Sequence, residues 1–351
     1  MPSIWGTDKQ GESVYRIKLS NKRGMQATIT NYGARLIGLS VPTNEQGNID
    51  VVLSLPTLEH YLEDSLSLGA TVGRYCNRIQ AGRLPLEGKI VQLDCNAGEH
   101  HLHGGEQGFN HRTWTVLDSS PSSLSLGLTS PDGDQAYPGR LEVQVDYELT
   151  DDNELLFRWQ AKTDAATVVS LTNHSYFNLA GQGDIGQHLL HIPTEHYTPT
   201  SNNGIPTGEI RPVVKSDLDF SQWRQLSTCI PDLPPALSPF GGLDHNWAFD
   251  AADSEKLMAE LACLATQLLM QIRSDLPGLQ CYTGNHLDGT GIHACFSGIA
   301  MESQYYPDSP NQPDFPSATL LPGETMTHLT RFSFLNLNEA QTASLKAVSS
   351  R

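Results

Sequence analysis

Basic residues are scarce in this sequence of 351 residues. Lys and Arg total 22 against 39 Asp and Glu, which gives a formal net charge of −17 at pH 7. No local cluster of Lys and Arg interrupts this acidic balance. Phosphate backbones and anionic lipid surfaces would therefore be repelled, and we expect neither a nucleic-acid partner nor a membrane partner.

Long apolar runs are missing as well. No window approaches the roughly 20 apolar residues that a membrane-spanning helix requires. A signal peptide would contain a basic segment followed by an apolar one. Residues 1–14 contain no such arrangement. The six cysteines form no C-x-x-C pair, which is typical of reduced thiols in a reducing compartment. These absences predict a soluble protein of the cytoplasm.

Motifs for two kinds of chemistry are also absent. The sequence contains no G-x-S-x-G elbow, so a serine nucleophile lacks support. It contains neither G-x-G-x-x-G nor a Walker-type loop, so no segment is suited to cradle the phosphates of a nucleotide.

Turn-forming residues and short β-prone runs, by contrast, are abundant. The chain has 30 glycines, 21 prolines and an apolar fraction of 38%, which is globular composition with many chain reversals. We predict an all-β fold of packed, mainly antiparallel sheets with few short helices. Large all-β proteins often remain undivided, so we expect a single domain over residues 1–351. The expected strands lie at 26–42, 51–55, 89–95, 123–129, 140–150, 154–163 and 166–179.

The strand pattern is clearest at 141–150. Apolar residues stand at positions 141, 143, 145 and 147, and polar residues stand at 142, 144 and 146. This alternation predicts a strand with one buried face and one wet face. Turn signals such as P-D-G-D at 131–134 and L-P-G-E at 321–324 supply the reversals that consecutive strands need.

Three segments do not show this pattern of short strands separated by turns. Leu257–Ile272 is rich in Ala, Leu, Met and Gln, which favour helix. In an all-β context, however, packing overrides local propensity, and we favour a hairpin that turns near 265–267. We expect only Pro56–Tyr61 to form a short helix. The Pro-rich passage Pro231–Gly242 is expected to be a surface loop.

Four polar clusters are candidates for chemistry. An arginine in an apolar run can simply pair with a carboxylate, and a lone histidine is often a hydrogen-bonded structural residue. Each cluster taken singly therefore has a structural explanation. The clusters are GRYCNRI at 73–79, HLHGG at 101–105, TNHSYFNL at 172–179, and ESQ at 302–304 leading into Pro307-Asp308.

Two further interpretations of these residues remain open at this point. His100, His101 and His103 could converge on a metal ion, although neither Cys nor Asp lies at close ligand spacing around them. Glu302 and Asp244 could be a carboxylate pair for glycoside hydrolysis, but the sequence does not fix the distance between them.

Taken together and in this order, the clusters resemble the aldose 1-epimerase (galactose mutarotase) family from about Asn31 through Phe334. A single motif such as LHGG would be weak, whereas nine in the right order are very specific. The resemblance implies a large β-sandwich, the galactose mutarotase-like supersandwich, with an open sugar cleft and no cofactor. The matching passages are NYGARL, GRYCNRI, LHGG, SPDGDQAYPG, TNHSYFNLAG, IPTGE, LDHN, LQCYTGN and ESQYYPDSPNQPDFPSATLLPGE.

The reaction that the resemblance implies needs two proton-transfer groups. Opening a pyranose removes the proton of the C1 hydroxyl and protonates the ring oxygen, and the ring then closes on the other face of the aldehyde. A carboxylate and an imidazole suit these tasks. By resemblance, Glu302 is the base at the C1 hydroxyl and His174 is the acid at the ring oxygen.

The resemblance also implies a set of sugar-binding residues. His103 would bond the sugar near its ring oxygen, and Asn77 and Arg78 would grip its hydroxyls, because Arg offers several donors in a fixed fork. Arg74 is then structural. The other expected contacts are Tyr176, Asp244 and Gln280.

Small departures from the family pattern occur at Cys76, Cys281 and Ser303, and none of them removes a proton-transfer group. The expected substrates are galactose and glucose, and the protein is expected to be a monomer or a homodimer. The alternatives are a hexose 6-phosphate epimerase or a non-catalytic carbohydrate-binding protein of the same fold, with a hydrolase as a third possibility.

Overall fold

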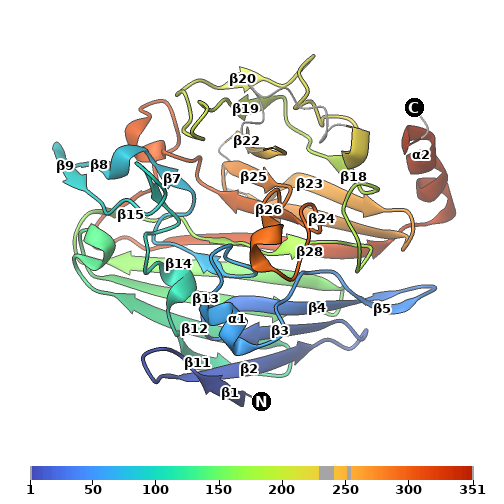
Figure 1. Ribbon diagram of the computed structural model, residues 1–351, viewed down its shortest axis with the longest axis horizontal. Coiled ribbons are helices and arrows are strands. Elements are labelled where there is room, and N and C mark those ends of the chain that lie inside the picture. Colours follow the sequence, from blue (N-terminus) through green and yellow to red (C-terminus); the bar gives the residue numbers. More distant parts are fainter. Residues whose placement is uncertain (1, 229–240, 251–253, 350–351) are drawn as a thin grey trace.

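Three antiparallel sheets dominate the computed structural model, which describes residues 2–228, 241–250 and 254–349 (Figure 1). The five-stranded sheet has the order β1-β2-β3-β4-β5, the nine-stranded sheet β11-β12-β13-β14-β28-β24-β23-β18-β21, and the six-stranded sheet β17-β26-β25-β22-β19-β20. All pairs of named strands are antiparallel in the described ranges. The predicted all-β sandwich is confirmed.

The five-stranded sheet contains β1 (Ser3–Thr7), β2 (Ser13–Ser20), β3 (Gln26–Thr30), β4 (Arg35–Thr43) and β5 (Gly47–Asp50). The nine-stranded sheet contains β11 (Thr115–Ser119), β12 (Ser123–Ser130), β13 (Leu141–Leu149), β14 (Glu154–Thr163), β18 (Leu189–His191), β21 (Arg224–Gln225), β23 (Lys256–Cys263), β24 (Leu268–Ser274) and β28 (Met326–Asn336). The six-stranded sheet contains β17 (Tyr176–Phe177), β19 (His196–Thr198), β20 (Arg211–Pro212), β22 (Asp244–Ala248), β25 (Gly278–Tyr282) and β26 (Ile299–Gln304).

Short elements complete the fold. Four two-stranded ladders pair β6 (Thr71–Val72) with β16 (Thr172–Asn173), β7 (Arg78–Ile79) with β10 (His101–Leu102), β8 (Arg83–Leu86) with β9 (Lys89–Gln92), and β15 (Thr167–Val168) with β27 (Thr319–Leu320). The α-helices are α1 (Leu58–Leu62) and α2 (Glu339–Ser349). In the part of the chain that the structure describes, no helix has the length and apolar character needed to cross a membrane.

One apolar core joins the three large sheets. It contains Leu39 from the five-stranded sheet, Trp159 and Phe332 from the nine-stranded sheet, and Trp247 and Leu279 from the six-stranded sheet, all of them buried. In Figure 1 the five-stranded sheet lies in the lower half and the six-stranded sheet in the upper half, while β28 of the nine-stranded sheet crosses between them. Burial of this common core fixes the sheets relative to one another.

The alternation predicted for 141–150 is confirmed. In β13 the residues at 141, 143, 145, 147 and 149 are buried, while Glu142 and Glu148 are exposed. The predicted strands at 123–129 and 154–163 are also present as β12 and β14. In these strands one face packs against the core, so the alternation of apolar and polar residues predicts the strand correctly.

Four predicted strands are wrong in their extent. The run 26–42 is divided into β3 and β4 by residues 31–34, and the run 89–95 is a strand, β9, only as far as Gln92. The run 51–55 is not a strand, because the chain leaves β5 at Asp50 and only Val52 forms an isolated bridge. Its valines are buried, so its β-prone composition reflects burial in the core rather than a ladder. The run 166–179 is divided into β15, β16 and β17, which belong to three different sheets. The chain passes from one sheet to the next along this segment, so no single ladder runs through it.

The segment Leu257–Ile272 forms the expected hairpin. Strand β23 ends at Cys263, β24 begins at Leu268, and Gln267 takes a positive φ of 56° in the turn. Met258 and Met270 are buried in the common core. Burial against the sandwich therefore decides the conformation, against the helical preference of the local sequence.

The expectation that 56–61 is the only helix is wrong. The helix at this site is α1, but α2 adds a second at the C-terminal end. Asn338 Oδ1 accepts from the Gln341 backbone N–H at 2.9 Å, and Gln341 Oε1 accepts from the Asn338 N–H at 3.0 Å. This reciprocal capping is a helix-start signal readable in sequence. A surface loop was also predicted at 231–242, and its residues 231–240 lie outside the described part of the chain.

Candidate active site

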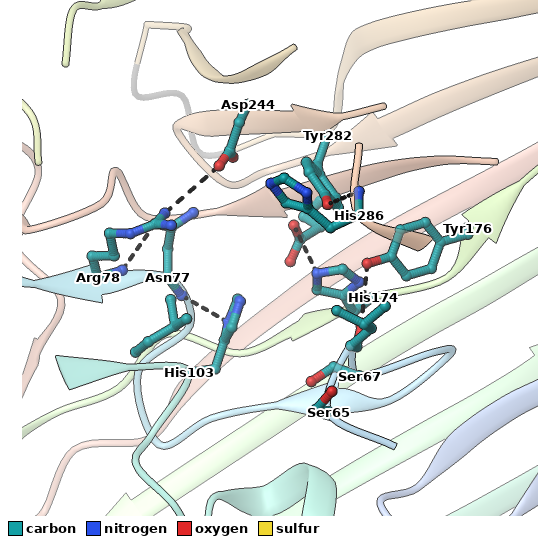
Figure 2. Close-up of a pocket in the computed structure, with 13 residues that line it drawn as sticks. Ser65, Ser67, Asn77, Arg78, His103, His174, Tyr176, Asp244, Tyr282 and His286 are labelled. Carbon is teal, nitrogen blue, oxygen red and sulfur yellow. Dashed lines mark hydrogen bonds and ion pairs between the residues drawn. The ribbon is translucent and has the colours of Figure 1, made fainter. Parts of the chain in front are cut away.

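A cavity of about 220 Å³ opens where the six-stranded sheet meets the β7–β10 ladder. Strand β26 carries Glu302, β22 carries Asp244 and β17 carries Tyr176, and His174 follows β16 directly. Figure 2 shows Arg78, Asn77 and Asp244 on one side of the cavity and Tyr176 and Tyr282 on the other. Seven of the eight residues predicted from the sequence line it: Asn77, Arg78, His103, His174, Tyr176, Asp244 and Glu302.

The carboxylate of Glu302 and the imidazole of His174 face each other within the cavity. Glu302 Oε1 lies 3.6 Å from His174 Nε2, and their side chains are 2% and 6% exposed. Glu302 Oε2 has no hydrogen-bond partner in the described part of the chain. A buried carboxylate oxygen without a partner is unusual, so this oxygen is available to a ligand that enters the cavity.

Burial shifts both groups toward their neutral forms. Desolvation raises the pKa of Glu302 well above its usual value; nearby Asp244 raises it further, while Arg78 opposes the shift. Desolvation lowers the pKa of His174 to about 4. Since burial disfavours the charged form of either group, the site favours a neutral carboxyl beside a neutral imidazole.

His103 is fixed in one tautomer by the backbone. Its Nδ1 accepts from the Asn77 backbone N–H at 3.1 Å, so the neutral ring carries its proton on Nε2. Desolvation lowers the pKa of His103 well below its usual value, and His174 adds to the effect. The rings of His103 and His174 lie 5.5 Å apart, nearly perpendicular. His103 is therefore a neutral hydrogen-bond donor beside His174.

Asp244 is held by two neighbours. Gln280 Nε2 donates to Asp244 Oδ1 at 2.6 Å, and Arg78 Nη1 lies 3.8 Å from Asp244 Oδ2. Gln280 stands opposite Glu302 in the β25–β26 ladder but does not line the cavity. Gln280 therefore contacts Asp244 from outside the lining of the cavity.

Three further residues of the sequence clusters, Arg74, His100 and His101, have structural partners. Arg74 is 1% exposed and donates to Ser130 Oγ at 2.6 Å and to the carbonyl of Gly139 at 2.9 Å. His100 Nδ1 accepts from the Ala81 N–H at 3.1 Å, and His101 bonds Tyr137 at 2.7 Å. Within the described ranges, no three His, Cys, Asp or Glu side chains are grouped so that they could hold a metal ion.

Sequence reasoning missed six residues that line the cavity. Tyr282 and His286 come from the LQCYTGN passage and the residues that follow it, so the motif itself was the available signal. The serines follow α1 in a stretch without any motif, and only the fold brings them here. The missed residues are Ser65, Leu66, Ser67, Leu102, Tyr282 and His286.

A buried ion pair holds the loop that carries these serines. Arg35 Nη1 lies 2.6 Å from Asp64 Oδ2, and both side chains are at most 1% exposed. Asp64 also accepts from the backbone N–H groups of Leu66 and Leu68 at 2.9 and 2.8 Å. The pair therefore fixes residues 64–68 as one wall of the cavity.

Removing one partner of this ion pair should destabilise the protein. We expect Asp64→Asn to lower the free energy of unfolding by about 3–5 kcal/mol, because it leaves the Arg35 charge buried without a counterion. Urea unfolding measures this, with Asp151→Asn as the control, since Lys22 and Asp151 also lie 2.6 Å apart but are exposed. Equal stability of the Asp64→Asn and Asp151→Asn variants would contradict this interpretation.

The chain is similar to known proteins over nearly its whole length. The family model described as aldose 1-epimerase matches residues 15–333. The chain is 38% identical over 336 residues to the galactose mutarotase of Mus musculus, covering 92% of this chain and 95% of that one. It is 34% identical over 335 residues to the aldose 1-epimerase of Escherichia coli K12, covering 93% and 96%.

The chain is also similar in fold to solved structures. The aldose epimerase homologue from C. elegans superposes with a TM-score of 0.86 at 29% identity, covering 92% of this chain and 99% of that one. The galactose 1-epimerase from Lactobacillus acidophilus superposes with a TM-score of 0.85 at 27% identity, covering 96% and 99%.

Proposed function

The chain belongs to the aldose 1-epimerase family, and from this premise we propose that Glu302 and His174 are the proton-transfer pair of its isomerase reaction. The proposal depends on one observation, the 3.6 Å contact between the buried Oε1 and Nε2 atoms in the cavity. A general base and a general acid must lie within reach of the same substrate, and this cavity provides both.

Ring opening transfers two protons through the sugar. Glu302 removes the proton of the C1 hydroxyl, the C1–O5 bond breaks as the aldehyde forms, and His174 gives a proton to O5. The pair passes from carboxylate and imidazolium to carboxyl and imidazole. Rotation about the C1–C2 bond and closure on the other face reverse these steps, so both groups return to their starting state.

The pKa shifts of the two groups suit this cycle. Burial favours the neutral pair, which is the state that accompanies the open-chain sugar. The neutral pair is therefore lower in free energy than the charged pair, which favours proton transfer through the sugar in the direction of ring opening. A general acid or base positioned at the reacting atoms contributes about 10²–10⁴-fold to the rate.

The remaining polar groups of the cavity would hold the sugar. Arg78 and Asn77 offer donors, Asp244 offers an acceptor oriented by Gln280, and His103 donates from Nε2. Tyr176 borders the reacting end, because its ring lies 5.0 Å from that of His174. Relatives named galactose mutarotase support galactose as a substrate, with glucose as its epimer at C4.

The alternatives find less support in the lining of the cavity. A hexose 6-phosphate would require cationic groups for its phosphate. Among the lining residues that the structure describes, Arg78 is the one Lys or Arg, and it lies beside Asp244. A binding protein has no need of a buried acid and base. A hydrolase would use Glu302 with Asp244, and it would release a reducing end, which mutarotation does not.

A substrate panel tests the proposed function. Polarimetry of freshly dissolved α-galactose, α-glucose, xylose and glucose 6-phosphate should show catalysed equilibration of galactose and glucose. A protein that accelerates only glucose 6-phosphate, or none of the four sugars, would contradict the proposal.

The pH dependence follows from the same pKa shifts. Activity requires one proton in the Glu302–His174 pair, so kcat/KM should fall when both groups are protonated and again when neither is. Since the pKa of His174 is lowered to about 4, the acid limb should lie near pH 4. The alkaline limb should lie above the usual carboxyl range, because the pKa of Glu302 is raised. An acid limb near pH 6.5, typical of a solvent-exposed imidazole, would contradict this assignment.

A further inference from the structure

The Pro307-Asp308 passage has no role in the reaction as described so far. Asp308 is fully buried and stands four residues beyond the end of β26, the strand that carries Glu302. Its backbone has a left-handed φ of 58°, a conformation that Asp and Asn tolerate better than most residues. A buried carboxyl in such a conformation is held there by specific partners.

These partners belong to the sugar-binding segment. The Asp308 backbone N–H donates to the carbonyl of Arg78 at 2.8 Å, and Asp308 Oδ1 accepts from the Gln80 backbone N–H at 2.8 Å. The two bonds lie on either side of Ile79 and brace strand β7. The carboxylate is itself fixed by Asn311 Nδ2 at 2.7 Å and Gln312 Nε2 at 3.0 Å.

Strand β7 depends on such bracing. It has only two residues and pairs only with the equally short β10. The residues around it, Asn77 and Ala81, take positive φ values of 64° and 51°, which are costly outside glycine. Two short strands cannot hold this geometry alone, so side-chain anchors decide where Arg78 sits.

We propose that Asp308 is a positioning residue that ties the segment bearing Asn77 and Arg78 to the chain leaving the Glu302 strand. It sets the distance between the groups that grip the sugar and the group that takes its proton. The inference rests on the proposed function, because it assumes that Arg78 binds the substrate. Loosening β7 should weaken ground-state binding, which raises KM more than it lowers kcat.

Two substitutions separate the carboxylate from the backbone conformation. Asp308→Gly keeps the left-handed φ without strain and removes the carboxylate, and we expect KM for galactose to rise about tenfold with kcat within about threefold. Asp308→Asn retains one acceptor oxygen, and we expect KM to rise about threefold. Asp8→Asn is the control, because Asp8 is also buried and accepts from two backbone N–H groups at 2.9 Å, but in the β1–β2 turn.

The same substitutions in an Arg78→Ala background distinguish positioning from general destabilisation. If Asp308 positions this segment, each Asp308 variant will raise KM by a smaller factor in that background than in the wild type. An unchanged KM in the folded single variants, or an equal added rise in the Arg78→Ala background, would overturn the proposal. If Asp308→Gly does not fold, as judged by thermal unfolding, Asp308→Asn decides by the same criteria. A failure of the proposed function is distinguishable, because the Glu302→Gln variant would then keep the kcat of the wild type.

Discussion

Replacement of Glu302 by Gln should lower kcat for the interconversion of galactose anomers by about 10²–10⁴-fold. The amide keeps the shape of the side chain and can still hydrogen-bond the C1 hydroxyl, but it cannot accept the proton. KM should change little, because binding of the ring depends on the other polar groups of the cavity. The substitution also removes a carboxyl whose pKa is raised by burial, so the variant should be at least as stable as the wild type.

The chain contains a matched control for this substitution. Glu260 Oε2 lies 2.9 Å from His191 Nδ1 in the nine-stranded sheet, away from the cavity residues. Glu260→Gln therefore makes the same chemical change in another Glu–His pair, and its kcat should match that of the wild type. A Glu302→Gln variant as active as Glu260→Gln would remove Glu302 from the role of base.

Replacement of His174 by Asn should lower kcat to a similar degree, about 10²–10⁴-fold. The Asn amide corresponds in position to the imidazole Nδ1, so it neither reaches the place of Nε2 nor releases a proton at neutral pH. Polarimetry with α-galactose measures the loss, and His191→Asn is the corresponding control. If His174→Asn kept wild-type activity, His103, whose ring lies 5.5 Å away, would become the candidate acid.

Most of the candidate site could be predicted because its residues lie in short motifs. Asp244, Gln280 and Glu302 come from three passages far apart in sequence, and the ladders of β22, β25 and β26 bring them onto one face of one sheet. The sequence does not contain that register. It arises from the packing of the six-stranded sheet on the common core, so only the structure shows the hydrogen bond from Gln280 to Asp244.

The cavity serines and the run 51–55 were not predicted correctly because contacts with distant parts of the chain decide their structure. Ser65 and Ser67 reach the cavity because a buried ion pair holds their loop, and no local pattern marks such a loop. The run 51–55 has the composition of a strand, but the core buries it without a ladder partner for most of its length. Composition reports burial more directly than it reports pairing. The helix α2 is different, since its capping residues were present in the sequence.

The central claim is that Glu302 and His174 act as one unit on one sugar. The most direct measurement is a double-mutant cycle, in which polarimetry follows freshly dissolved α-galactose with the wild type, Glu302→Gln, His174→Asn and the combined variant. Residues that act as a unit are not additive, so the combined variant should be about as slow as the slower single variant. Losses that multiply, or full activity in either single variant, would contradict the account.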